Sequence, residues 1–509
     1  MSFAELKIKK LETTRIGTIY EGITHNFYEL NKNFLTNEEF KFAKLLKIIV
    51  ETNGAISELS LIEKLPDDFA LNFRENILSS IDINELNKVL PDKKNNEYLK
   101  KSLNEMFKKI DFIKNKELFV DYFLARTIGL KKLYFFEMED DFEELMVNGE
   151  NSIFIYHKKY GMCKTNVSLD EKSLHTILGK ISNSTGKSFS LTTPLMDSRL
   201  PNGYRVNATY ESISPKFPTL TIRKFARIPL TILDLIETNC LTSEAAAFLW
   251  TMVDGIGIYP HNIIVCGGTA TGKTVMLNTL SNFIRLNERI VTIEDTLELS
   301  LFERDNCIAL ESKHTTEMEV SMNDLIKNSL RMRPDRIIVG EVRGNDALTL
   351  FTAMDNGHRG TLGTLHADNS KEAIVKLQEK PFAIPPALIS LVDIIIIMKK
   401  KHNKDKTIRY CSEITELSQM DGKVLMANLY EYDQNFEKLK RTDIPSHSIE
   451  KFSEQTSLTK NEIKKEIETR KMILDWMISR NIRKPEDILE FIQTYYYSPE
   501  KVLKVIYGN

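Results

Sequence analysis

The sequence has 509 residues, of which 42% are hydrophobic and 28% are charged, the ordinary mixture of a globular protein. Its 69 basic and 71 acidic residues give a net charge of −2, which argues against a nucleic-acid-binding protein. The five cysteines lie too far apart for a C-x-x-C zinc or redox site. The amino terminus lacks the apolar core of a signal peptide, and no apolar stretch reaches the roughly 18 residues of a membrane span. We therefore expect a soluble, cytoplasmic chain that meets a membrane only through a partner.

Residues 1–130 are charged and rich in leucine. Leu99, Leu103 and Phe107 recur at intervals of four residues, which is the spacing of one face of a helix. We therefore predict an N-terminal helical region. Its apolar face either packs on the rest of the chain or docks a partner.

Residues 131–228 have a different pattern, in which short apolar runs alternate with turns at two Asn-Gly pairs. One helix is expected near residues 171–184. This pattern predicts a small mixed α/β domain. Residues 223–229 are predicted to form a linker because Pro229 interrupts regular strand pairing.

Residues 229–430 alternate apolar runs of strand length with helical stretches. Strands are expected at residues 262–266, 289–293, 336–340, 361–365 and 393–398. Apolar strands separated by helices indicate an α/β fold with a mainly parallel sheet covered on both faces. Residues 431–509 are predicted to form a helical C-terminal tail, with helices over residues 462–480 and near 486–495.

The strongest motif is GGTATGKT at residues 267–274, which matches the phosphate-binding pattern G-x-x-x-x-G-K-[ST]. An apolar strand precedes it and a helical pattern follows, as in nucleotide-binding P-loops. Lys273 is expected to reach the β- and γ-phosphates of ATP, and the Thr274 hydroxyl to bind Mg²⁺. The residues expected to contact the nucleotide are Gly267, Gly268, Thr269, Ala270, Thr271, Gly272, Lys273, Thr274 and Val275.

Carboxylates end two other predicted strands. Glu341 follows the apolar run IIVG, where it can polarise a water molecule or hold the Mg²⁺ shell. Glu294 ends the run VTI, and Glu298 lies four residues further on. Parallel strands end at one edge of a sheet, which is where ligands bind. The alternatives are a surface role for Glu341 and a helix-capping role for Glu298.

Histidines and arginines supply further candidates. His358 and His366 lie together in GHRGTLGTLHAD, where either could sense the γ-phosphate or couple subunits. Arg205 and Arg223 flank the predicted linker and could reach the phosphates if the small domain folds over the nucleotide. A second group of arginines lies among the nucleotide motifs and comprises Arg331, Arg333, Arg336, Arg343 and Arg359. Structural salt bridges are the alternative role for each arginine.

Four motifs occur in the order GGTATGKT, VTIEDTLEL, LRMRPDRIIVGEVRG and GHRGTLGTLHAD. This arrangement resembles the secretion ATPase superfamily, which includes type II and type IV secretion, pilus-assembly and archaellum motors. The stretches LPNGYRVNATY and TLTIRKF look like the N-terminal domain of that superfamily. The resemblance implies a RecA-like P-loop core in which Lys273, Thr274 and Glu341 carry catalysis. It also implies that Glu294, Glu298, His358 and His366 form the acidic and histidine boxes.

Two features narrow the resemblance. The chain lacks the four-cysteine zinc insertion of many bacterial members, and its C-terminal stretch looks like that of archaeal members, especially archaellum motor ATPases. The resemblance implies a homohexamer at the inner face of the cytoplasmic membrane, docked on a polytopic platform protein and other archaellum motor components. It also implies that Arg205 and Arg223 approach the nucleotide. An archaeal pilus-assembly ATPase is the alternative.

Overall fold

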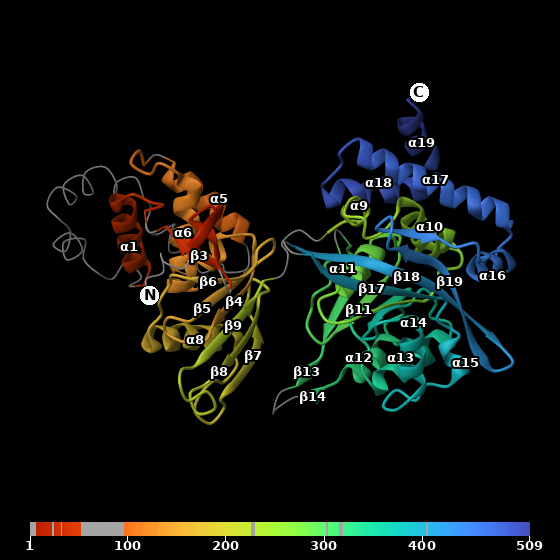
Figure 1. The fold of residues 1–509 in the computed structure, drawn as a ribbon, viewed down its shortest axis with the longest axis horizontal. Coiled ribbons are helices and arrows are strands. Elements are labelled where there is room, and N and C mark those ends of the chain that lie inside the picture. The colour runs from red at the N-terminus through yellow and green to blue at the C-terminus, as the bar shows by residue number, and fades with distance from the viewer. Residues whose placement is uncertain are drawn as a thin grey trace. The chain divides into compact units, whose positions relative to one another are not determined.

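The computed structural model describes residues 7–22, 25–31, 33–51, 96–108, 110–127, 129–224, 230–301, 304–314, 319–403 and 406–508. The chain divides into two compact units, residues 1–226 and residues 227–509 (Figure 1). Each unit has its own sheet and its own hydrophobic core.

The first unit is built on a nine-stranded sheet with the order β1-β2-β3-β6-β5-β4-β9-β8-β7. Neighbouring strands are antiparallel except for β3 and β6, which are parallel. The strands are β1 (Lys7–Thr13), β2 (Gly17–Gly22), β3 (Asn26–Leu30), β4 (Phe142–Val147), β5 (Ile153–His157), β6 (Gly161–Thr165), β7 (Leu195–Arg199), β8 (Arg205–Thr209) and β9 (Thr219–Arg223). The helices are α1 (Asn37–Glu51), α5 (Asn96–Phe107), α6 (Lys116–Thr127), α7 (Tyr134–Met138) and α8 (Glu171–Thr185).

The prediction of a wholly helical region over residues 1–130 is wrong for residues 7–13, 17–22 and 26–30, which form β1, β2 and β3. Ile19 and Tyr28 of these strands are buried in the same core as Leu145 and Ile222. The strands are short and each buries few side chains, so their alternation gives only a weak sequence signal. The boundary expected at residue 130 therefore lies inside one folded unit.

The helix predicted from Leu99, Leu103 and Phe107 is present as α5, and all three side chains are fully buried. The helix expected near residues 171–184 is α8, which begins after the N-cap Asp170. The predicted linker lies mostly outside the described residues, which omit 225–229.

The second unit is also built on a nine-stranded sheet, with the order β12-β11-β15-β16-β10-β17-β18-β19-β20. The first six of these strands are parallel and the last three add antiparallel hairpins. The strands are β10 (Ile263–Gly267), β11 (Ile290–Glu294), β12 (Cys307–Glu311), β15 (Arg336–Val339), β16 (Leu362–Leu365), β17 (Ile394–Asn403), β18 (Lys406–Met420), β19 (Lys423–Asp433) and β20 (Lys438–Arg441). A small separate hairpin joins β13 (Lys313–His314) and β14 (Glu319–Val320). The five strands expected from the sequence correspond to β10, β11, β15, β16 and β17.

Helices cover both faces of this sheet (Figure 1). Alternate residues of β10 enter different cores, with Ile263 and Val265 in one and Ile264 and Cys266 in the other. The helices are α9 (Ile232–Glu237), α10 (Ser243–Asp254), α11 (Lys273–Ser281), α12 (Met322–Ser329), α13 (Asn345–Asp355), α14 (Ser370–Gln378), α15 (Pro386–Ile389), α16 (His447–Gln455), α17 (Lys460–Ser479), α18 (Pro485–Tyr497) and α19 (Pro499–Tyr507). The unit is therefore an α/β structure, as predicted.

The C-terminal helices belong to this unit and are not a separate tail. Ile473 and Met477 of α17 are fully buried in the core that contains Ile263. The boundary expected at residue 430 falls within β19, which pairs with β18 and β20. Among the described residues, no helix is long and apolar enough to cross a membrane.

Candidate nucleotide site

The carboxyl ends of the parallel strands bring the sequence motifs to one edge of the second sheet. The phosphate-binding loop follows β10, Glu294 ends β11, Glu341 follows β15 and His366 follows β16. Topology alone therefore places Glu294, Glu341 and His366 at the edge that carries Lys273.

The loop of residues 267–274 is held in its turn by backbone conformation and by close packing. Gly272 has φ +95°, which strains any residue with a Cβ, and α11 begins at the next residue. A Cβ on Gly267 would lie 2.5 Å from the carbonyl oxygen of Met398 in β17. The Thr271 hydroxyl donates a hydrogen bond of 2.9 Å to the Gly268 carbonyl. The loop is thus closed on itself at the start of a helix, where backbone N–H groups can bind an anion.

Lys273 places its ammonium group inside this loop. Nζ donates hydrogen bonds to the carbonyl oxygens of Gly267 and Gly268, at 2.9 and 3.0 Å. Burial lowers the pKa of Lys273, and the nearby charge of Glu341 opposes that shift. Thr274 and Val275 are half-buried in the first turn of α11. The arrangement offers phosphate a cation and the positive end of a helix together.

Three residues beside the loop were missed by the sequence analysis. Lys400 Nζ donates to the Thr269 carbonyl at 3.0 Å, and Arg409 Nε donates to the Ala270 carbonyl at 3.1 Å. These two cations come from β17 and β18 and brace the exposed part of the loop. Asp368 lies on the other flank, with Oδ1 3.2 Å from the position of a Cβ on Gly268. Its place two residues after His366 was the signal that could have identified it.

Glu294 shapes the acidic segment that follows β11. Its side chain is buried, and Oε2 accepts hydrogen bonds from the backbone N–H groups of Glu298 and Leu299, at 2.8 and 3.0 Å. Glu298 itself is exposed. Glu294 therefore fixes the backbone of the turn, while Glu298 presents its carboxylate to solvent.

Glu341 is partly buried and forms an ion pair with Arg343. Arg343 Nε donates to Glu341 Oε2 at 2.9 Å, while its Nη1 lies 3.1 Å from Oδ2 of Asp295. Arg343 therefore links the acidic groups that follow β15 and β11. The charge of Glu341 opposes the lowering of the Lys273 pKa, and both residues lie at the carboxyl ends of parallel strands.

Two other arginines of the motif region have structural roles. Arg336 is buried, forms an ion pair with Glu288 and donates to the Val253 carbonyl at 3.0 Å. Arg359 pairs with the buried Asp393 at 2.9 Å. Both lie at the amino ends of the parallel strands, away from the phosphate-binding loop. These two arginines therefore form structural salt bridges, which was the alternative that the sequence left open.

The structure separates the two histidines. His366 is exposed and directly follows Leu365, the partner of Cys266 at the start of the loop. His358 precedes β16, and its backbone N–H binds the Ala353 carbonyl at 3.1 Å. His358 therefore lies at the opposite edge of the sheet and is not brought together with His366 or Lys273.

Arg205 and Arg223 face each other directly across β8 and β9 in the first unit. Arg199 of β7 is opposite Arg205 in the same row. It was missed by the sequence analysis although it directly precedes the stretch LPNGYRVNATY. Arg205 pairs with Asp197 at 3.0 Å and Arg223 with Glu144 at 3.6 Å. Since Arg205 and Arg223 are exposed, this row presents positive charge on one face of the sheet.

Comparison with known proteins is consistent with this geometry. The sequence profile of the family described as "Type II/IV secretion system protein" matches residues 138–478, which include both the arginine row and the phosphate-binding loop. The chain belongs to this family. Within this chain, residues 227–509 form the α/β unit that carries the predicted phosphate-binding loop.

Two relatives of this type II/IV secretion system protein come from an archaeon, and others are bacterial conjugal-transfer and type IV secretion proteins. Uncharacterized protein MJ0781 of Methanocaldococcus jannaschii is 29% identical, with 75% of this chain and 78% of the relative covered. Uncharacterized protein MJ0900 of the same organism is 30% identical, with 74% and 69% covered. A solved structure, the VirB11 ATPase of the Brucella suis type IV secretion system, is 22% identical, with 57% of this chain and 97% of that chain covered and a TM-score of 0.29. The archaeal relatives fit the branch indicated by the C-terminal sequence.

Proposed function

We propose that this secretion-family protein is a Mg²⁺-dependent ATPase that drives the assembly or rotation of an archaellum filament. The observation that carries the ATPase is the position of Lys273 within the phosphate-binding loop, with Glu341 after β15, two strands away at the same edge of the sheet. Membership of the type II/IV secretion family and the two relatives from Methanocaldococcus jannaschii support the archaeal motor.

Each residue of the site has a role in this proposal. Lys273 and the N–H groups of the loop bind the β- and γ-phosphates, and Thr274 holds Mg²⁺. Bound Mg²⁺ would neutralise charge on those phosphates. Glu341 orients the attacking water and accepts its proton, once released from Arg343. Glu294 keeps the acidic turn in place, so that Glu298 can contact the metal-bound water.

The remaining predicted residues act around this centre. His366 lies at the edge of the loop, where it can respond to the γ-phosphate. Arg205 and Arg223 supply positive charge from the first unit to a nucleotide, within one chain or between subunits. His358, at the far edge of the sheet, is assigned to coupling between subunits.

The proposed working form is a homohexamer at the inner face of the cytoplasmic membrane. It docks on a polytopic platform protein and on other archaellum motor components, and reaches the membrane only through them. The net charge of −2 favours a protein partner over nucleic acid. The second candidate is an archaeal type IV pilus-assembly or secretion ATPase, which the same family membership supports.

Phosphate release by the full chain with ATP tests the chemistry. We expect hydrolysis that needs Mg²⁺ and is not stimulated by DNA. Lys273→Ala should lose nucleotide binding, whereas Glu341→Gln should bind ATP and turn over at least about tenfold more slowly, which is roughly 1.4 kcal/mol of lost transition-state stabilisation. Glu311→Gln is the matched control, because Glu311 ends β12, two strands from β15 at the same edge of the sheet. Full turnover by Glu341→Gln would remove Glu341 from its role.

The filament is identified by placing Glu341→Gln in the chromosome of the host. Swimming is then scored and surface filaments are imaged by electron microscopy. Loss of swimming and of thick filaments, with thin pili retained, is the expected result. Loss of thin pili with intact swimming would assign the protein to pilus assembly.

A further inference from the structure

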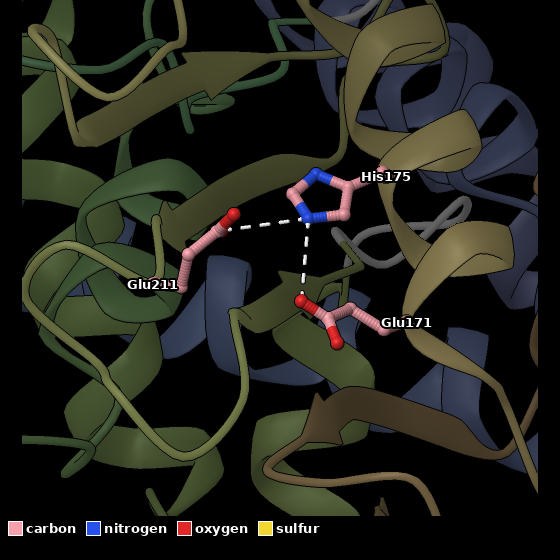
Figure 2. A group of neighbouring side chains, drawn as sticks. All are labelled: Glu171, His175 and Glu211. Carbon is pink, nitrogen blue, oxygen red and sulfur yellow. Dashed lines mark ion pairs between the residues drawn. The ribbon is translucent and has the colours of Figure 1, made fainter.

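A cluster of three candidate metal ligands lies in the first unit, on elements that the proposed ATPase chemistry does not use. Glu171 and His175 are one turn apart on α8, so they share a helix face. Glu211 follows β8 in the connection to β9. Figure 2 shows the His175 ring directed at both carboxylates, with Nε2 3.8 Å from Glu171 Oε1 and 3.4 Å from Glu211 Oε2. One donor atom from each residue lies within 4.8 Å of the others.

The Glu211 side chain is 33% exposed, but one of its carboxylate oxygens is enclosed by protein. Its Oε2 atom is inaccessible to solvent and forms no hydrogen bond within the described part of the chain. A buried carboxylate oxygen is costly unless a cation or a donor satisfies it. Among the described residues, the ion pairs of Glu171 and Glu211 are with His175 and not with lysine or arginine. The cluster therefore has two carboxylates and no permanently charged cation of its own.

We propose that Glu171, His175 and Glu211 bind one divalent transition metal ion, of which Zn²⁺ fits best. Metal–ligand distances of about 2.0–2.1 Å in a tetrahedron separate the ligand atoms by roughly 3.3–3.4 Å. The His175–Glu211 pair already has this separation. Glu171 is the more exposed carboxylate, and its Oε1, 3.8 Å from Nε2, would have to move closer when the ion binds.

The donor set selects the class of ion. An imidazole nitrogen with two carboxylate oxygens suits Zn²⁺, Co²⁺ or Mn²⁺, whereas Mg²⁺ and Ca²⁺ prefer oxygen ligands alone. Three protein ligands leave a fourth position for solvent. The site is therefore chemically distinct from the Mg²⁺ position proposed at Thr274.

The ion would join α8 to the carboxyl end of β8, the strand that begins with Arg205. Tyr210, between that strand end and Glu211, packs beside His175 with ring centroids 5.2 Å apart and the rings tilted by 58°, which limits rotation of the imidazole. His175 also borders a surface cavity along α8, lined in addition by Thr176, Gly179 and Lys180. A solvated route therefore reaches the site.

The test is a metal titration of the full chain after chelation, without nucleotide. Zn²⁺ binding is measured by calorimetry, and Co²⁺ binding by its visible absorption, which reports nitrogen ligation. We expect one equivalent of tightly bound metal that excess Mg²⁺ does not displace. His175→Ala and Glu211→Gln should each weaken binding at least tenfold. His447→Ala, which removes an exposed histidine from the second unit, should bind as the wild type does.

Circular dichroism and the melting temperature of the metal-free variants verify that each variant is folded. Zn²⁺ should raise the melting temperature of the wild-type chain and leave that of His175→Ala unchanged. Two results would overturn the proposal: no saturable binding by a folded wild-type chain, or undiminished binding by folded His175→Ala. Loss of stability in His175→Ala without any metal binding by the wild type would assign the cluster to a protonated histidine bridging two carboxylates.

Discussion

Gly340 packs directly against Glu294: a Cβ at position 340 would lie 2.9 Å from Glu294 Cγ. The backbone N–H of Gly340 also donates to the Ile293 carbonyl at 2.8 Å. The ends of β15 and β11 therefore interlock at the edge that carries Glu341. The glycine before Glu341 is explained by the space that the buried Glu294 side chain requires.

Gly340→Ala should lower the rate of ATP hydrolysis about tenfold or more. The added methyl group displaces Glu294, which releases the N–H groups of Glu298 and Leu299 and shifts the acidic turn. Steady-state phosphate release measures this loss. Gly363→Ala is the control from the adjacent strand, since its Cβ would meet Ile264 at an ordinary 3.4 Å. Equal losses in both variants would contradict the specific role of Glu294.

Breaking the buried ion pair between Arg470 and Asp254 should destabilise the second unit by about 1.5–3 kcal/mol, the contribution of a hydrogen bond to a charged group, because Arg285 remains as a partner of Asp254. The pair joins α17 to α10 at 2.9 Å, and both side chains are almost fully buried. Arg470→Met tests this by denaturant unfolding. Lys471→Met is the matched control on the same helix, because Lys471 is exposed and should contribute about 0–1 kcal/mol. Similar losses would show that the buried pair is unimportant.

The sequence identified the parts of the fold with strong local signals. The buried parallel strands are continuous apolar runs, and the spacing of glycine and lysine in residues 267–274 specifies a phosphate-binding loop. The strands β1 to β3 and β18 to β20 were missed. Their exposed or mixed side chains resemble those of loops and helices, and their pairing depends on contacts distant in sequence.

The motifs of the site could be predicted from the sequence, but the ion pairs between its side chains could not. Nothing local distinguishes Arg343, which binds Glu341, from Arg336 and Arg359, which make buried ion pairs at the other edge. The separation of His358 from His366 was available, however. A strand between two residues carries them to opposite edges of a parallel sheet, and β16 lies between these two.

Arg205→Gln and Arg223→Gln should each reduce ATP turnover while leaving the melting temperature within about 2 °C of the wild type. Both arginines are exposed, so their ion pairs contribute little to stability. In the proposed function, these two arginines place positive charge near the phosphates of the nucleotide. Phosphate release and thermal unfolding are measured on the same samples. Lys216→Gln is the control, because Lys216 is an exposed cation of the same unit outside the row. If Lys216→Gln lost as much activity as the two arginine variants, the loss would be a nonspecific effect of charge.

His261 should make the second unit sensitive to mild acid. The ring is fully buried, and burial lowers its pKa. The charge of Asp393 raises the pKa, whereas the charges of Arg359 and Lys451 lower it further. Above the ordinary histidine pKa of about 6.5, the residue is neutral in both folded and unfolded chains. Below that pH the unfolded chain takes up a proton that the folded chain does not. Stability should therefore fall as the pH drops, by up to about 1.4 kcal/mol per pH unit, until the lowered pKa of the folded state is reached.

His261→Phe tests this pH dependence, because phenylalanine keeps a ring between Tyr259 and Phe452 and cannot take up a proton. Unfolding free energies are compared with those of the wild type at several pH values between 5 and 7.5. The difference between the two proteins should change with pH below about 6.5 and remain constant above it. Comparing differences removes the contributions of His25 and His157, whose pKa values burial also lowers. A difference independent of pH across the whole range would show that His261 is not the group that titrates.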